Sequence, residues 1–220
     1  MGDPAGTGPG EIAPDGSAVE FYALLPTMGE PPIVHSAVPA GASILELGCG
    51  TGRILRPLAT LGHPVFGVDE SPAMLAHLPD LPTAGAQIET LQLDRTFDAV
   101  LLASTMINAD PLQRRAFLTS CHRHVRPGGI VVIQQAPPSE PAAPTVREVD
   151  GIRRVIRSAR REGPRVDLVV EYHVGDRMWT HTFGRYDISA EELTADLGSA
   201  GLQLDRWLTD DRSWFTARPI

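Results

Sequence analysis

Apolar residues follow two alternating patterns through the middle of the chain. Short apolar runs at Ile44–Leu47 and Phe97–Ala103 are typical of buried parallel strands, and the stretches between such runs have helical spacing. Further strands are predicted over Pro64–Asp69 and Ile130–Gln134. Strands that alternate with helices favour an α/β fold built around a mostly parallel sheet.

The predicted helices carry recognisable end signals. Ser71 followed by Pro72 supplies the residue types preferred at a helix cap and at the first helical position. Ser189 and Glu192 have the spacing of a capping box. Helices are therefore expected over residues 53–61, after Ser71, over 111–125 and after Ser189, and two short helices over 17–25 and 32–37 form a cap before the sheet.

After a Pro-rich connector over residues 136–145, the apolar period becomes nearer two. Arg165–Val174 and Arg177–Phe183 alternate on either side of a Gly-Asp turn, which is a hairpin signal. An antiparallel β insert is therefore expected over residues 146–188. Closing strands are expected over residues 202–208 and 213–218.

Length and local composition predict the domain organisation. The chain has 220 residues, which fits one domain. Residues 1–15 are mostly Gly, Pro, Asp and Ala with little to bury, which predicts a flexible tail. Residues 16–220 are then expected to form a single domain, in which the insert over 146–188 covers an acceptor molecule.

Charge and cysteine content narrow the class of partner. The net charge of −8 disfavours binding to nucleic acid or to an anionic membrane surface. All 19 basic residues are Arg, which indicates GC-rich coding and favours a bacterial source. Cys49 and Cys121 are expected to be free thiols in a reducing compartment. No stretch approaches the ~18 apolar residues of a membrane span. We therefore expect a cytoplasmic monomer or homodimer that acts on a small molecule.

A glycine-rich segment carries the strongest chemical signal. The sequence from Glu46 to Gly52 reads ELGCGTG and lies directly between a predicted strand and a predicted helix. Its glycines let the backbone turn sharply and approach a ligand closely. Asp69 ends the next strand about 20 residues further on, where a carboxylate can accept hydrogen bonds from ribose hydroxyls. This combination predicts a nucleotide-type site.

These motifs resemble the class I S-adenosylmethionine-dependent methyltransferases of the small-molecule type. ELGCGTGR matches the family's first motif, and VFGVDES, FDAVLLA and RPGGIVVI are similar to its second, fourth and fifth strands. The resemblance implies a Rossmann-like sheet of seven strands, mostly parallel with an antiparallel last strand. A NAD-binding oxidoreductase is a weaker alternative, because its glycines are spaced G-x-G-x-x-G.

The resemblance also implies which residues bind S-adenosylmethionine, which leaves S-adenosylhomocysteine as the product. Gly48 and Gly50 would lie against its methionine and ribose parts, Glu46 below the loop, and Asp69 at the ribose hydroxyls. The whole implied cofactor set is Tyr22, Glu46, Gly48, Gly50, Gly52, Asp69, Glu70, Met74, Gln87, Ile88 and Ala103. In this interpretation Glu70, Met74, Gln87 and Ile88 surround the adenine, and Ala103 and Ser104 pass close under the sulfonium.

Methyl transfer from a sulfonium is an in-line displacement with a neutral leaving group, so alignment does most of the work. No His, Cys or carboxylate cluster has metal-ligand spacing, so no metal is expected. If the acceptor must lose a proton, Tyr22 assisted by Glu20 is the candidate base and His181 the second choice. Tyr22 could equally serve only to cover the donor.

Candidate acceptor contacts come from two places. Asn108 follows the fourth strand, where it either faces the acceptor or caps a loop. Trp179, His181 and Phe183 alternate onto one face of the predicted hairpin, as a pocket roof or as ordinary packing. The predicted function is methylation of a small, aromatic or amine-bearing, natural-product-like acceptor at nitrogen, oxygen or a ring carbon such as that of indole. A donor-binding protein that transfers no methyl, such as a cyclase or a regulator, is the alternative.

Overall fold

The computed structural model describes residues 4–136 and 143–220. Two compact units divide the chain: residues 27–137 with 188–220 form the larger unit, and residues 1–26 with 138–187 form the smaller unit. A single domain over 16–220 stays a prediction; within the chain, the insert and the N-terminal segment form a compact unit of their own. Residues 1–3 of the predicted tail and 137–142 of the predicted connector lie outside the described residues.

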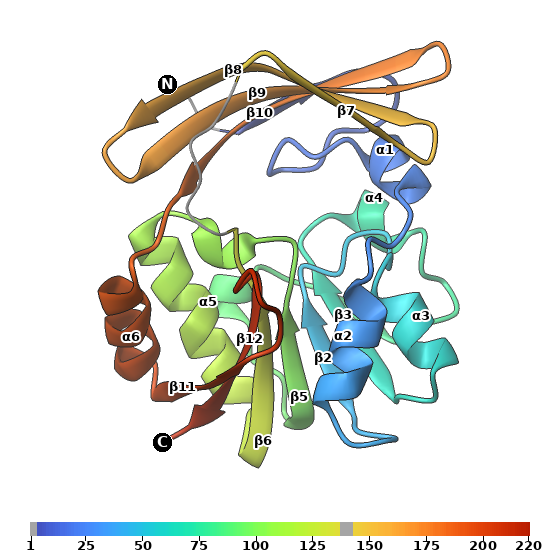
Figure 1. Cartoon of the computed structure of the whole chain (residues 1–220). Coiled ribbons are helices and arrows are strands. Elements are labelled where there is room, and N and C mark those ends of the chain that lie inside the picture. Colours follow the sequence, from blue (N-terminus) through green and yellow to red (C-terminus); the bar gives the residue numbers. More distant parts are fainter. Residues whose placement is uncertain (1–3, 137–142) are drawn as a thin grey trace. The chain divides into compact units, whose positions relative to one another are not determined.

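The larger unit is built on a sheet of seven strands in the order β11-β12-β6-β5-β2-β3-β4 (Figure 1). Five strands run parallel, and β12 pairs antiparallel with both β6 and β11. This confirms the predicted sheet with its antiparallel last strand. The strands are β2 (Ile44–Leu47), β3 (Val65–Asp69), β4 (Thr83–Gly85), β5 (Phe97–Leu102), β6 (Val125–Gln134), β11 (Leu202–Trp207) and β12 (Trp214–Pro219).

Helices cover both faces of this sheet, as a parallel sheet requires. Leu45 and Leu47 of β2 belong to one apolar core with residues of α5 and α6, and Ile44 belongs to a second core with residues of α2 and α3. The capping box at Ser189 and the side-chain cap at Ser71 are both confirmed. The elements are α2 (Glu30–Ala37), α3 (Leu55–Thr60), α4 (Pro72–Leu75), η1 (Ile88–Thr90), η2 (Met106–Asn108), α5 (Pro111–His124) and α6 (Ala190–Ser199).

The smaller unit is an antiparallel sheet in the order β1-β10-β9-β8-β7, accompanied by the short helix α1 (Figure 1). The predicted hairpin is confirmed as β9 and β10, joined by a tight turn. The elements are β1 (Ala5–Thr7), α1 (Val19–Leu24), β7 (Thr145–Val149), β8 (Ile152–Glu162), β9 (Arg165–Val174) and β10 (Arg177–Tyr186).

Part of the segment predicted to be a flexible tail forms a strand. Ala5–Thr7 forms β1 and pairs with β10, with Gly6 opposite His181. The carbonyl of Pro9 accepts a hydrogen bond of 2.8 Å from Trp179 Nε1. Glycine and proline gave no apolar pattern to read, but the sheet edge supplies backbone hydrogen bonds that do not depend on side chains.

Among the described residues, no helix combines the length and the apolar character that crossing a bilayer requires.

Candidate functional site

The glycine loop leaves β2 in a conformation that only glycine adopts without strain. Gly48, Gly50 and Gly52 have φ angles of 68°, 54° and 82°. A Cβ on Gly48 would lie 2.6 Å from the sulfur of Met106, whereas a Cβ on Gly50 would meet only the sulfur of Met74, at 3.9 Å. The backbone is therefore closely packed at Gly48 and open at Gly50, which fits close approach of a ligand there.

Asp69 lies beside this loop, as predicted. Its Oδ2 accepts a hydrogen bond of 2.8 Å from the Gly50 backbone N–H, and its Oδ1 accepts one of 2.9 Å from the Ser71 N–H. The carboxylate therefore joins the glycine loop to the start of α4. A carboxylate has two oxygens that can each accept more than one hydrogen bond, which suits a residue that holds a loop beside a ligand.

The predicted adenine-side residues are gathered near the same loop. Met74 and Ile88 are buried, and the Ile88 Cδ1 lies 3.7 Å from where a Cβ of Gly48 would be. Gln87 Nε2 donates a hydrogen bond of 3.4 Å to Glu70 Oε2. Two apolar side chains thus border the loop, and the residues next to Asp69 and Ile88 in sequence form an amide–carboxylate pair, a composition suited to a flat heterocycle with polar edges.

Asn108 is buried, and its amide is bonded to the chain after β6. Its Oδ1 accepts a hydrogen bond of 2.7 Å from the Ala136 N–H, and its Nδ2 donates one of 3.3 Å to the Ala136 carbonyl. Only 2% of Asn108 is exposed. Asn108 therefore fixes the backbone after β6 to the loop after β5, and its contact with an acceptor stays a prediction.

Glu46 is a buried carboxyl below the glycine loop. Its Oε2 has no hydrogen-bond partner among the described residues, and burial raises the pKa of the carboxyl to about 8. Arg53, whose positive charge acts to lower that pKa, donates to Glu30 Oε1. One guanidinium cannot neutralise two buried carboxylates, so Glu46 keeps a proton. Sequence reasoning missed the Arg53–Glu30 pair, although Arg53 directly follows the loop.

Stability should depend on pH through Glu46. Between its ordinary pKa of 4.5 and about 8, the folded chain keeps a proton that the unfolded chain releases. The free energy of unfolding should therefore fall as pH rises through that window. Thermal melts of the ligand-free protein from about pH 5 to about pH 8 should show this slope, and Glu46→Gln should flatten it because an amide does not ionise. Glu70→Gln, at an exposed site, is the control and should keep the slope. Equal slopes in the wild type and Glu46→Gln would contradict the assignment.

In the smaller unit, Trp179 is a core residue. Its indole lies 5.5 Å from the Phe21 ring, which stacks on Tyr172 at 4.2 Å, and only 1% of Trp179 is exposed. Trp179 therefore packs in the core of this unit, which is the packing alternative left open by the sequence, and its contact with an acceptor stays a prediction. Tyr22 is half-buried and edge-on to Phe21, with ring centroids 5.9 Å apart.

Glu20 lies close to an arginine, and its role beside Tyr22 stays a prediction. Its carboxylate lies 3.8 Å from the guanidinium of Arg177, and the side chain is about half exposed. Positions two apart on a helix point in different directions, so Glu20 is poorly placed to assist Tyr22.

His181 and Phe183 share the face of the hairpin that carries Trp179, as predicted. Their β9 partners on that face are Val170 and Leu168. The two rings lie 4.7 Å apart, and His181 Nε2 is 3.1 Å from the Asp15 carbonyl, to which it donates. Burial lowers the pKa of His181, so the ring is neutral at pH 7 and its Nδ1 is an acceptor.

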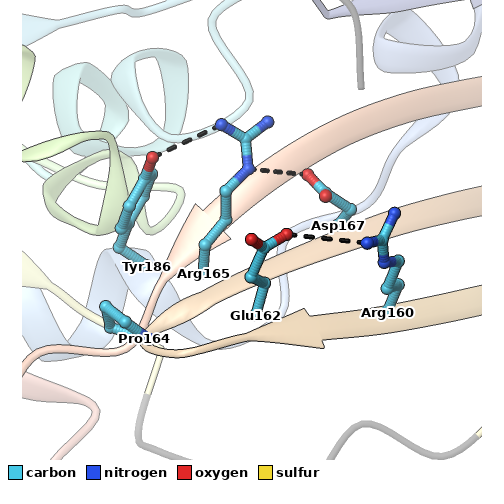
Figure 2. A pocket seen from close by; sticks show the side chains of 6 residues that line it. All are labelled: Arg160, Glu162, Pro164, Arg165, Asp167 and Tyr186. Carbon is cyan, nitrogen blue, oxygen red and sulfur yellow. Dashed lines mark hydrogen bonds and ion pairs between the residues drawn. The ribbon is translucent and has the colours of Figure 1, made fainter.

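A polar hollow lies on the opposite face of the same sheet, at the start of β9 (Figure 2). Arg165 donates to Asp167 Oδ1 at 2.8 Å and to the Tyr186 hydroxyl at 3.4 Å, and Arg160 pairs with Glu162 at 3.7 Å. The two guanidinium groups and two carboxylates of this hollow pair with each other, so it offers no net charge to a ligand.

The chain was compared with known proteins. A family model described as a methyltransferase domain matches residues 44–129. The chain is 34% identical to a dTDP-3-amino-3,6-dideoxy-alpha-D-glucopyranose N,N-dimethyltransferase from Streptomyces fradiae. This match covers 79% of this chain and 74% of the relative's length. A cypemycin N-terminal methyltransferase from a Streptomyces species is 32% identical over 57% of each chain.

A solved structure supports the same relationship. An amino pentose methyltransferase of calicheamicin biosynthesis from Micromonospora echinaspora, with S-adenosylmethionine bound, matches with a TM-score of 0.70. It is 27% identical, and the match covers 93% of both chains. The likeness therefore extends over both units of the chain and not only over the glycine loop and its sheet.

Proposed function

Because this chain belongs to the class I S-adenosylmethionine-dependent methyltransferase family, we propose that it transfers a methyl group to the amine of a small molecule, and specifically of a nucleotide-linked amino sugar. The 34% identity to an amino-sugar N,N-dimethyltransferase over four fifths of the chain carries this proposal. The similarity of the whole chain to an amino pentose methyltransferase supports it.

The residues around the glycine loop fit S-adenosylmethionine. Asp69 would accept from the ribose hydroxyls, Met74 and Ile88 would line the adenine, and the open backbone at Gly50 leaves room for the ligand to approach. The cofactor supplies a methyl group on a positively charged sulfur. Protonated Glu46 leaves the region below the loop without an additional negative charge.

The acceptor nitrogen must present a lone pair, so an ammonium substrate has to lose a proton before it attacks. His181 is a candidate for this step, since it is neutral at pH 7 and its Nδ1 can accept. Tyr22 remains the second candidate, without help from Glu20. Both belong to the smaller unit, which carries the segment predicted to cover the acceptor.

The proposal is tested by an acceptor screen read by mass spectrometry. With S-adenosylmethionine present, dTDP-linked amino sugars should gain one or two methyl masses, and the matched sugars with a hydroxyl in place of the amine should gain none. Product from phenols or indoles alone would replace the proposal with the aromatic acceptor expected from the sequence. Donor binding without product from any acceptor would favour a regulator.

Two variants, His181→Gln and Tyr22→Phe, assayed on the active acceptor, then identify the base. The variant that removes the base should lower kcat by about 100-fold.

A further inference from the structure

The chain makes a strained turn directly after the central strand β5. Ser104 and Thr105 have φ angles of 54° and 57°, so two consecutive residues that are not glycine adopt the left-handed conformation. This region is unfavourable for residues with a Cβ, and above all for a β-branched residue such as Thr105. Backbone strain of this kind persists only where surrounding contacts impose it, and it concentrates at functional sites.

Gln134, at the end of β6, supplies one of those contacts. Its side-chain Oε1 accepts a hydrogen bond of 2.7 Å from the backbone N–H of Ser104. Within the turn, the Met106 N–H donates to the Ala103 carbonyl at 3.1 Å. The first strained residue is thus tied to the neighbouring strand by a side chain that no motif identified.

The strained turn lies against the glycine loop. Strand β5 pairs with β2 in a parallel register that places Leu102 beside Leu47, so the turn and the loop leave adjacent strands at the same sheet edge. The sulfur of Met106 occupies the space that a Cβ of Gly48 would need, at 2.6 Å. A change in the conformation of Ser104 and Thr105 would therefore shift Met106 relative to Gly48 and the donor loop.

We propose that Gln134 is a positioning residue for methyl transfer, which holds the Ser104–Thr105 turn in its strained conformation against the donor loop. This inference rests on the proposed function. Methyl transfer depends on alignment of the attacking nitrogen with the methyl group and its sulfur, so a small displacement of the turn lowers kcat more than it lowers donor affinity.

The kinetic test compares two substitutions of Gln134. Gln134→Leu removes the acceptor for the Ser104 N–H at similar volume, and Gln134→Glu keeps an acceptor oxygen. Gln134→Leu should lower kcat at least tenfold while calorimetric affinity for S-adenosylmethionine changes less than about threefold, and Gln134→Glu should recover most of the rate. The control is Gln135→Leu, which breaks a 2.8 Å hydrogen bond to the Arg212 carbonyl and should leave kcat unchanged. Unchanged kcat in Gln134→Leu, or a parallel loss of kcat and donor affinity, would overturn the proposal.

Thr105→Gly tests whether the strained conformation serves catalysis or only the stability of the fold. Glycine adopts the left-handed conformation freely, so the melting temperature should stay the same or rise while kcat falls, because the turn is no longer confined. A merely structural turn would tolerate this change with full kcat, and that result would also overturn the proposal.

A third readout does not depend on the acceptor. With ¹³C-methyl methionine, the Met106 signal, assigned by Met106→Leu, should be single and narrow in wild type with S-adenosylhomocysteine, and broadened or split in Gln134→Leu. Unaltered line shape would count against the positioning role. If no amine acceptor is found but the Met106 signal behaves as expected, the proposed function fails and the positioning of the turn stands.

Discussion

Replacing Asp69 with alanine is expected to lower the affinity for S-adenosylmethionine and S-adenosylhomocysteine by about 100-fold or more. Within the chain the carboxylate accepts from Gly50 and Ser71, and in the proposed donor site it would also accept from the ribose hydroxyls. Hydrogen bonds to a charged group contribute about 1.5–3 kcal/mol each, and about 2.8 kcal/mol corresponds to 100-fold in affinity. Loss of the two ribose hydrogen bonds alone would therefore account for a 100-fold loss of affinity.

Titration calorimetry measures the loss of affinity for both ligands, and two controls test whether it comes from the ribose contacts of Asp69. Asp80→Ala removes an exposed carboxylate that pairs with Arg56 on the surface, and it should leave donor affinity unchanged. Melting of ligand-free Asp69→Ala reports whether the glycine loop alone has been disturbed. Wild-type affinity in Asp69→Ala would remove Asp69 from the donor site.

The sequence predicted the glycine loop and its neighbour Asp69 because their determinants are local. The glycines at 48, 50 and 52 are demanded by positive φ angles, and Asp69 ends the strand that pairs with β2. The β9–β10 hairpin was likewise readable from its alternation and its turn. In each case, residues close together in sequence specify the geometry.

What the sequence did not predict depends on contacts between distant segments. Glu20 meets Arg177 and Trp179 meets Pro9, and neither pair leaves a periodic signal in the sequence. The strained turn at Ser104 and the buried state of Glu46 are likewise set by surrounding structure rather than by local residue type. The acceptor-side predictions were weaker for this reason, since they treated the hairpin face as if it were open.

A buried ion pair joins α5 to α6 in the larger unit. Arg114 Nε donates to Asp196 Oδ2 at 2.6 Å, with side chains only 3% and 5% exposed, and the half-exposed Arg115 donates to Oδ1 at 2.7 Å. Burial raises the pKa of Asp196, but the hydrogen bonds from Arg115 and Arg114 outweigh it, so the pKa lies below its ordinary value. Stability from this pair should therefore be lost as pH falls through that lowered pKa.

Asp196→Ala should accordingly lower the free energy of unfolding by about 3–5 kcal/mol, because it leaves the Arg114 guanidinium buried and without its carboxylate. Urea unfolding followed by circular dichroism measures this. Arg115→Ala is the matched control: it removes only the exposed partner and should cost at most about 1 kcal/mol. Replacing both buried partners, in Arg114→Met with Asp196→Leu, should recover much of the loss, since apolar side chains of similar size leave no charge behind. A double variant as unstable as Asp196→Ala would show that lost packing between α5 and α6, rather than an unpaired charge, causes the destabilisation.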